Sequence, residues 1–277
     1  MIARLIIPII LSIVLPDLYI DWHHWRHRHG YGWWQRALWW APGMAMLVYS
    51  VALATIRNFV PDDLTWVNVY MILMGLIVVP KALFTICSGF GYLCCRLCGG
   101  HRNWGNMLAL VLIVFNWYVL VYGFTVGFGK LEVRHVDLYF DDLPPAFDGY
   151  RIVHFTDAHV GTLETRDIGL LRRDIDSINA QHADLIAFTG DLQNIRPQEI
   201  QRAQGLLSTL SARDGVVSVL GNHDYSKYVH ETPQKEAANR AETIARERQC
   251  GWRLLLNEHL AIRRGQDTIV IAGEQNF

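Results

Sequence analysis

The strongest constraint on this 277-residue chain is a series of long, uncharged apolar runs within its first 130 residues. Ala37–Ile56 and Met107–Phe128 contain no charged residue, and Leu64–Pro80 adds a third such run. Each of the three approaches or exceeds the length that a helix needs to cross about 30 Å of hydrocarbon. Leu5–Leu15 is shorter, but aromatic residues typical of a membrane interface follow it. We therefore expect residues 1–130 to form a membrane domain with about four transmembrane helices.

Basic residues beside these runs indicate an orientation. The loops after the first and third spans carry six Lys or Arg residues, and the span ends on the other side carry four. The ten are Arg26, Arg28, Arg36, Lys81, Arg96 and Arg102 on one side, and Arg4, Arg57, Lys130 and Arg134 on the other. Because basic residues favour the cytoplasmic side, this multi-pass integral membrane protein is expected to hold its second domain outside the cytoplasm.

Few polar groups interrupt the spans. Asp17 and Lys81 are expected near span ends, and Asn116 is expected to hydrogen-bond between helices. A transporter or channel built from the four spans is a weak hypothesis, because ionisable groups within the membrane usually mark such pathways. The net charge of −1 likewise argues against a nucleic-acid partner.

After Gly129 the pattern changes to short apolar runs typical of strands, alternating with segments of helical period. The expected strands are Glu132–Phe140, Arg151–Thr156, Asp184–Thr189, Val216–Leu220, Arg253–Leu256, His259–Arg263 and Thr268–Ala272. Helices are expected through Ile168–Ile178 and Ile200–Leu210, and a third after Thr232. This alternation predicts an α/β fold, in which ligands gather at the carboxyl ends of the strands.

Three short strings of metal-binding residue types stand where apolar strands end. They are Asp157-Ala158-His159, Gly190-Asp191 with Asn194 shortly after, and Gly221-Asn222-His223-Asp224. Carboxylate, amide and imidazole groups suit hard or borderline divalent metals. Three turns that each offer such donors predict a two-metal hydrolytic centre.

The spacing assigns a role to each donor. Asp157 and His159 are two apart, so in an extended segment their side chains point the same way and both can bind one ion. The two oxygens of Asp191 can bridge two cations, and Asn222 offers a carbonyl oxygen to the second. His223 need not be a ligand, because it can donate a proton or a hydrogen bond to the reacting phosphate.

The order Asp-x-His, Gly-Asp-x-x-Asn, Gly-Asn-His-Asp resembles the calcineurin-like metallophosphoesterases, and the run Gly149–His159 resembles their membrane-linked bacterial branch. The resemblance implies that residues 131–277 are the N-terminal part of a calcineurin-like sandwich with two divalent ions (Mn, Fe or Zn). It implies that Asp157 and His159 hold one ion, Asp191 bridges, and Asn222 holds the other. His223 would then stabilise the transition state, with Asn194 and Asp224 as orienting groups.

One family feature is missing. Members carry further histidine ligands ending in a Gly-His-x-His motif, and none follows Asp224; His230 and His259 stand in other contexts. We expect the chain to be a fragment that is truncated at its C-terminus, with an incomplete sandwich.

The leading functional hypothesis is a membrane-anchored, metal-dependent phosphoesterase that attacks a phosphoester with a metal-bound hydroxide. Membrane attachment suggests a lipid-linked substrate. The alternative is a catalytically incomplete membrane module that only binds metal, which the missing histidines favour. The number of bound ions separates the two hypotheses.

Overall fold

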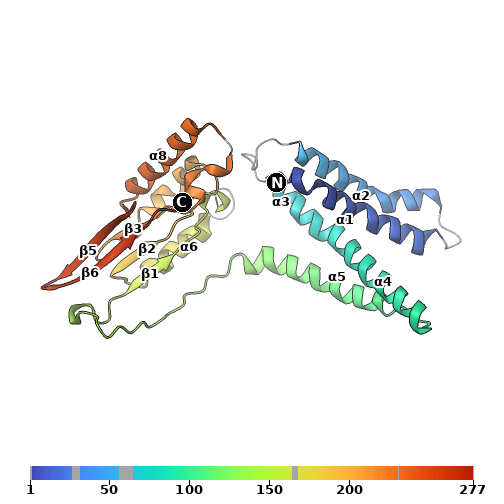
Figure 1. Ribbon diagram of the computed structural model, residues 1–277, viewed down its shortest axis with the longest axis horizontal. Coiled ribbons are helices and arrows are strands. Elements are labelled where there is room, and N and C mark those ends of the chain that lie inside the picture. The colour runs from blue at the N-terminus through green and yellow to red at the C-terminus, as the bar shows by residue number, and fades with distance from the viewer. Residues whose placement is uncertain (1, 27–31, 56–64, 164–167, 230, 277) are drawn as a thin grey trace. The chain divides into compact units, whose positions relative to one another are not determined.

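The structure is a computed structural model that describes residues 2–26, 32–55, 65–163, 168–229 and 231–276. The chain divides into two compact units, Met1–Lys130 and Leu131–Phe277 (Figure 1). Arg28, Arg57 and His230, which entered the sequence analysis, lie outside the described residues.

The first unit consists of apolar helices. They are α1 (Ile2–Ile20), α2 (Trp33–Ala54), α3 (Thr65–Leu73), α4 (Val79–Cys98) and α5 (Gly105–Tyr122), with π-helical turns at Asp21–Trp25, Met74–Val78 and Gly123–Gly127. The π-helical turn Met74–Val78 joins α3 to α4 in one long helix. Among the described residues, four helices are therefore long and apolar enough to cross a membrane: Leu5–Trp25, Trp33–Ala54, Thr65–Cys98 and Gly105–Gly127. The expectation of four apolar helices is confirmed.

The π-helical turn at Met74–Val78 is tied to α5 by hydrogen bonds. Asn116 Nδ2 donates to the carbonyl of Gly75 at 2.9 Å, and Trp117 Nε1 donates to the carbonyl of Leu76 at 3.4 Å. A π turn widens the helix and changes its hydrogen-bond pattern, so its carbonyls are available to a neighbouring helix. The helix–helix hydrogen bond expected of Asn116 is thus present.

Asp17 and Lys81 lie inside the helix bundle, and Lys81 is not near a span end. It lies midway along Thr65–Cys98, and its Nζ is 2.6 Å from Asp17 Oδ1. The Asp17 side chain is 1% exposed and that of Lys81 is 13% exposed. Lys81 also lies over the ring of Trp39 at 4.6 Å, and a Cβ at Gly43 would collide with the Asp17 carboxylate. The sequence could not show this, because the partners are far apart along the chain.

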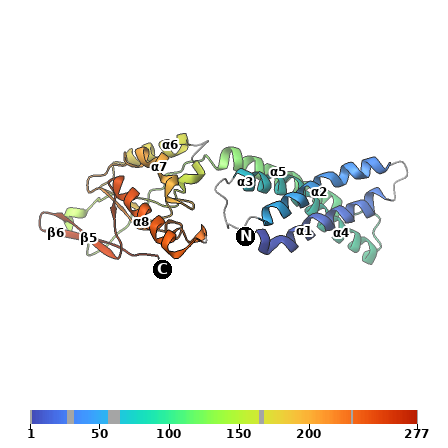
Figure 2. The ribbon, with the colours of Figure 1, turned by 90° about the horizontal axis from the view of Figure 1, so that it is seen from above.

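The second unit is built on a parallel sheet with strand order β1-β2-β3-β4. The strands are β1 (Ile152–Phe155), β2 (Leu185–Phe188), β3 (Val216–Ser218) and β4 (Arg253–Leu254). Helices α6 (Ile168–Asn179), α7 (Ile200–Leu207) and α8 (Pro233–Gln249) connect them, and α6 and α7 lie side by side (Figure 2). A hairpin of β5 (Glu258–Arg264) and β6 (Asp267–Gly273) completes the unit.

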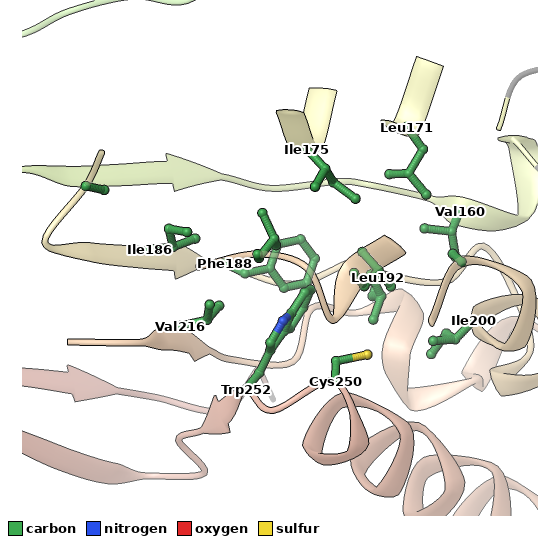
Figure 3. Packing of buried hydrophobic residues seen from close by; sticks show 14 residues of the cluster. Val160, Leu171, Ile175, Ile186, Phe188, Leu192, Ile200, Val216, Cys250 and Trp252 are labelled. Carbon is green, nitrogen blue, oxygen red and sulfur yellow. The ribbon is translucent and has the colours of Figure 1, made fainter. Parts of the chain in front are cut away.

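Both faces of the parallel sheet are covered by apolar side chains. On the helical side, Ile175 of α6, Phe188 of β2 and Trp252 belong to one buried cluster (Figure 3). On the other side, Leu185 and Val217 of the sheet pack with Ile262 of the hairpin. Burial on both faces explains why β2 and β3 are continuous apolar runs rather than alternating ones. The domain is therefore α/β, as expected.

One expected strand is absent. Residues 132–140 alternate polar and apolar side chains, but the structure shows them exposed and outside any sheet. Tyr139 is 90% exposed and Val136 is 76% exposed. Alternating polar and apolar residues are typical of an extended, pleated backbone. A β-strand also needs a neighbouring strand with which to form hydrogen bonds. The expectation of a strand at Glu132–Phe140 was wrong for this reason.

Candidate metal centre

The three donor strings lie at one edge of the parallel sheet, because each follows the carboxyl end of a neighbouring strand. The first two loops run together beyond the strands. Asp157 N donates to the carbonyl of Gly190 at 3.0 Å, and His159 N donates to the carbonyl of Asp191 at 3.1 Å. These bonds continue the β1–β2 pairing into the loops and bring the first two donor strings side by side.

Two glycines let the second and third loops approach each other. Gly190 has a φ of +97°, and a Cβ there would collide with the backbone of Gly221. A Cβ at Gly221 would collide with Asp191 in turn. Only glycine fits such a contact, and only glycine adopts this backbone angle without strain. The approach places Asp191 beside the third loop.

Three candidate ligands have an unusual backbone conformation. Asp157, His159 and Asp191 have φ angles of +53°, +39° and +60°, in the left-handed region that non-glycine residues rarely adopt. Each such residue costs about 1–3 kcal/mol, so the surrounding structure must enforce the conformation. Residues strained in this way cluster at functional sites.

His159, Asp191 and His223 form the core of the centre. One donor atom of each lies within 4.8 Å of the donor atoms of the other two, and all three residues are half-buried. The imidazole of His159 has its Nδ1 3.2 Å from the carbonyl of Gln193, and that of His223 has its Nδ1 2.6 Å from the carbonyl of Asn194. Because a carbonyl only accepts, each Nδ1 carries the proton and donates it. In the neutral ring, Nε2 is then left with a lone pair for a metal.

Asp157 and Asn222 lie at the margin of this cluster. Asp157 Oδ1 is 3.7 Å from His159 Nε2, and its side chain is 60% exposed. Asn222 is exposed, and its Nδ2 donates to the hydroxyl of Tyr228 at 2.6 Å. The structure thus brings Asp157 next to His159, and it holds the amide of Asn222 through Tyr228.

Asp224 connects the second and third loops through backbone hydrogen bonds to its side chain. Its buried carboxylate accepts backbone N–H groups from Asp191 at 2.8 Å, Leu192 at 3.0 Å, Gln193 at 3.3 Å and Gly221 at 2.9 Å. Burial raises the pKa of Asp224 to about 6, the backbone hydrogen bonds act in the opposite direction, and the charge of Asp191 adds to the rise. The side chain therefore orients the loop that carries Asp191.

Sequence analysis missed two residues that shape the second loop. The Glu199 carboxylate accepts the N–H groups of Asn194, Ile195 and Arg196, at 2.6 Å for Asn194. Gln193 is buried, and its Nε2 donates to the carbonyl of His223 at 3.1 Å. Glu199 had a signal in the sequence, since Pro at the first turn and Glu at the third position are typical of a helix start. Gln193 had none.

The donor set fits a divalent cation. Two imidazoles with available Nε2 atoms and a carboxylate meet at one point, and this combination suits Zn, Mn or Fe. Backbone carbonyls hold both rings in orientation, as is usual for histidines that bind metals.

Comparisons with known proteins match both units of the chain. Residues 3–128 match the family model described as "Probable Calcineurin-like phosphoesterase, transmembrane domain", and residues 150–274 match "Calcineurin-like phosphoesterase". The chain is 39% identical over 89 residues to the "Uncharacterized metallophosphoesterase YkuE" of Bacillus subtilis (strain 168), covering 31% of this chain and 30% of that protein. No solved structure matches.

A second relative is named as a transmembrane protein. The chain is 28% identical over 120 residues to a "Transmembrane protein with metallophosphoesterase domain" of Danio rerio, covering 43% of this chain and 26% of that protein. Both alignments span less than a third of the relative's length. Two family models match the two structural units in turn, so the chain carries a region of the calcineurin-like phosphoesterase transmembrane type followed by a calcineurin-like phosphoesterase domain.

Proposed function

We propose that the chain is a membrane-anchored hydrolase that cleaves a phosphoester with the help of two divalent ions held by Asp157, His159, Asp191 and Asn222. The observation that carries the proposal is the convergence of His159, Asp191 and His223 from three strand ends. When bound, the ions supply an activated water and positive charge for the leaving oxygen. Asp191 would be the residue shared by the two ions, since a carboxylate has two oxygens.

The two histidines have different proposed roles. His159 would bind one ion through Nε2 in its neutral form, because its Nδ1 lies 3.2 Å from the carbonyl of Gln193 and donates its proton there. His223 is the catalytic group in this proposal. In its cationic form Nδ1 donates to the carbonyl of Asn194 while Nε2 donates to a phosphate oxygen, which stabilises the charge that develops there.

A second arrangement is supported by the same cluster. A ring nitrogen of His223 lies within 4.8 Å of the donor atoms of His159 and Asp191, close enough to complete a three-ligand site for one ion. Removing the His223 side chain should leave the metal content unchanged in the first arrangement and lower it in the second.

Hydrolysis is tested on the full chain purified in detergent, stripped with a chelator and then supplied with Mn²⁺ and a chromogenic phosphodiester. The wild type should hydrolyse the diester, and Asp191→Ala should fall to the background rate. Asp148→Ala, which removes an exposed carboxylate from a turn before β1, should keep wild-type activity. A wild type that binds Mn²⁺ but hydrolyses no faster than Asp191→Ala would favour the metal-binding module instead.

The proposed substrate is a lipid-linked phosphoester on the outer face of the membrane. Four spans keep the phosphoesterase domain beside a lipid surface, and the six-to-four distribution of basic residues supports the extracytoplasmic side. A reporter that fluoresces only in the cytoplasm, fused after Phe277, should stay dark. In mixed micelles, a phospholipid diester should be cleaved with a higher kcat/KM than a soluble diester, and equal values would contradict the lipid assignment.

A further inference from the structure

We infer that Tyr228 is a positioning residue of the metal centre, whose hydroxyl orients the amide of Asn222 and whose ring holds the imidazole of His223. This inference rests on the proposed function, and it adds a residue that none of the three donor strings contains. It depends on two contacts that a single side chain makes with neighbouring members of the third donor string.

The chain turns back on itself to place Tyr228 there. Ser226 adopts a left-handed conformation with φ of +55°, which ends the short helix His223–Tyr225. Ser226 is buried, and its Oγ accepts a hydrogen bond from Gln193 Nε2 at 3.0 Å. The turn Lys227–Val229 then carries Tyr228 back over Asn222 and His223. The hydrogen bond from buried Gln193 to Ser226 therefore holds the reversal of chain direction that places Tyr228.

The hydroxyl decides which end of the Asn222 amide faces a cation. Nδ2 donates to Tyr228 Oη at 2.6 Å, so Oδ1 is the remaining polar atom of that amide. A cation binds an amide through its oxygen, and an NH₂ group turned toward it would be repelled. Tyr228 and a bound ion thus favour the same orientation of Asn222, and each should strengthen the binding of the other.

The ring of Tyr228 acts on His223. The two ring centroids are 4.6 Å apart with an angle of 34° between the planes. His159 packs against His223 edge-on at 4.7 Å and 85°, and Nδ1 of His223 is 2.6 Å from the carbonyl of Asn194. With two ring contacts and one hydrogen bond, the imidazole of His223 is held in one orientation.

The two effects can be separated by substitution. Tyr228→Phe removes the hydroxyl and keeps the ring, whereas Tyr228→Leu removes both. Tyr225→Phe is a matched control, since it makes the same chemical change in the same loop. The Tyr225 hydroxyl is buried and has no hydrogen-bond partner among the described residues.

The experiment measures Mn²⁺ binding to the chelator-stripped full chain by calorimetry without substrate, and then diester hydrolysis at saturating Mn²⁺. Tyr228→Phe should weaken the second ion about tenfold, as is usual when an outer hydrogen bond to a ligand is lost, and should change kcat by less than about threefold. Tyr228→Leu should weaken the ion equally and also lower kcat at saturating Mn²⁺. Tyr225→Phe should match the wild type in both measurements.

Normal binding of both ions by Tyr228→Phe would overturn the role of the hydroxyl while leaving the proposed function intact. Equal kcat for Tyr228→Phe and Tyr228→Leu would overturn the role of the ring. A wild type that binds no Mn²⁺ would overturn both the inference and the function on which it rests.

Discussion

Asp191 Oδ1 accepts a hydrogen bond from the backbone N–H of His223 at 2.9 Å. The carboxylate proposed as a metal ligand therefore also holds the loop that carries the proposed catalytic histidine. Since the donor is backbone, the bond does not depend on the His223 side chain. Substitutions at the two positions should have different consequences.

His223→Ala should lower turnover by about 10²–10⁴-fold, the range for loss of a positioned acid–base group. Its metal content should change little, because the proposed ligands and the bond to Asp191 remain. Asp191→Ala should lose metal and activity together. Elemental analysis and diester hydrolysis of the full-length protein measure both properties. If His223→Ala loses metal as fully as Asp191→Ala, then His223 is a ligand and its assigned role is wrong.

Gly190→Ala should destabilise the chain by about 2–4 kcal/mol, since overpacking adds to the cost of a left-handed alanine. The added Cβ would meet the backbone of Gly221. Gly149→Ala is the matched control, with φ of +70° and open space around it, and should cost about 1 kcal/mol. Denaturant unfolding of the metal-free chain compares the two. Equal losses would show that the backbone angle alone, and not the contact with Gly221, requires glycine.

Glu247 should make the domain less stable as pH rises. Burial raises the pKa of Glu247 to about 8, the charge of Asp224 adds to the rise, and the hydrogen bond from Ser218 opposes it. The unfolded chain titrates near 4.5, so between the two values the folded state binds more protons. Stability should therefore fall as pH rises through this window, by an amount on the order of a few kcal/mol.

Glu247→Gln should reduce that slope, most clearly above pH 6, where Asp224 with its raised pKa has already titrated. The variant should be more stable than the wild type at pH 8 and similar near pH 4.5. The melting temperature across this range measures the effect. Glu258→Gln, at an exposed position of β5, should keep the wild-type slope. An unchanged slope in Glu247→Gln would assign the pH dependence to other groups.

Lys81→Met should destabilise the membrane domain by about 3 kcal/mol, because it leaves the buried charge of Asp17 without its partner. The double variant Asp17→Asn with Lys81→Met removes both charges and should recover part of that loss. Thermal unfolding in detergent measures each variant. If the double variant is no more stable than Lys81→Met, the pair does not act through its charges.

The sequence predicted the elements whose signals are local. Apolar runs ending at Asp157, Asp191 and Asn222 gave the parallel strands and the edge where the site lies, since the carboxyl ends of such strands meet. Thr232 followed by Pro233 predicted the start of α8, and the Thr232 side chain does accept a hydrogen bond from Lys235 N. For Glu132–Phe140 the local signal was present but the pairing partner was not.

The rest of the site depends on contacts between distant residues. Gln193 donates a hydrogen bond to the carbonyl of His223, and Tyr228 accepts one from the amide of Asn222. Neither Gln193 nor Tyr228 belongs to a recognisable motif. Asp157, His159 and Asp191 adopt left-handed conformations that remain uncommon even for Asp and His, the types in which they are enriched, so residue type alone does not predict them.

The pairing of Asp17 with Lys81 has a consequence for how the membrane domain is made. The partners are 64 residues apart in the chain. At a synthesis rate of 5–20 residues per second, Asp17 leaves the ribosome roughly 3–13 s before Lys81 does. During that interval the first helix must carry an acidic group without its counter-ion, which is costly in hydrocarbon. Its final placement in the bilayer therefore depends on the arrival of the third span, so the helices of this domain mature together.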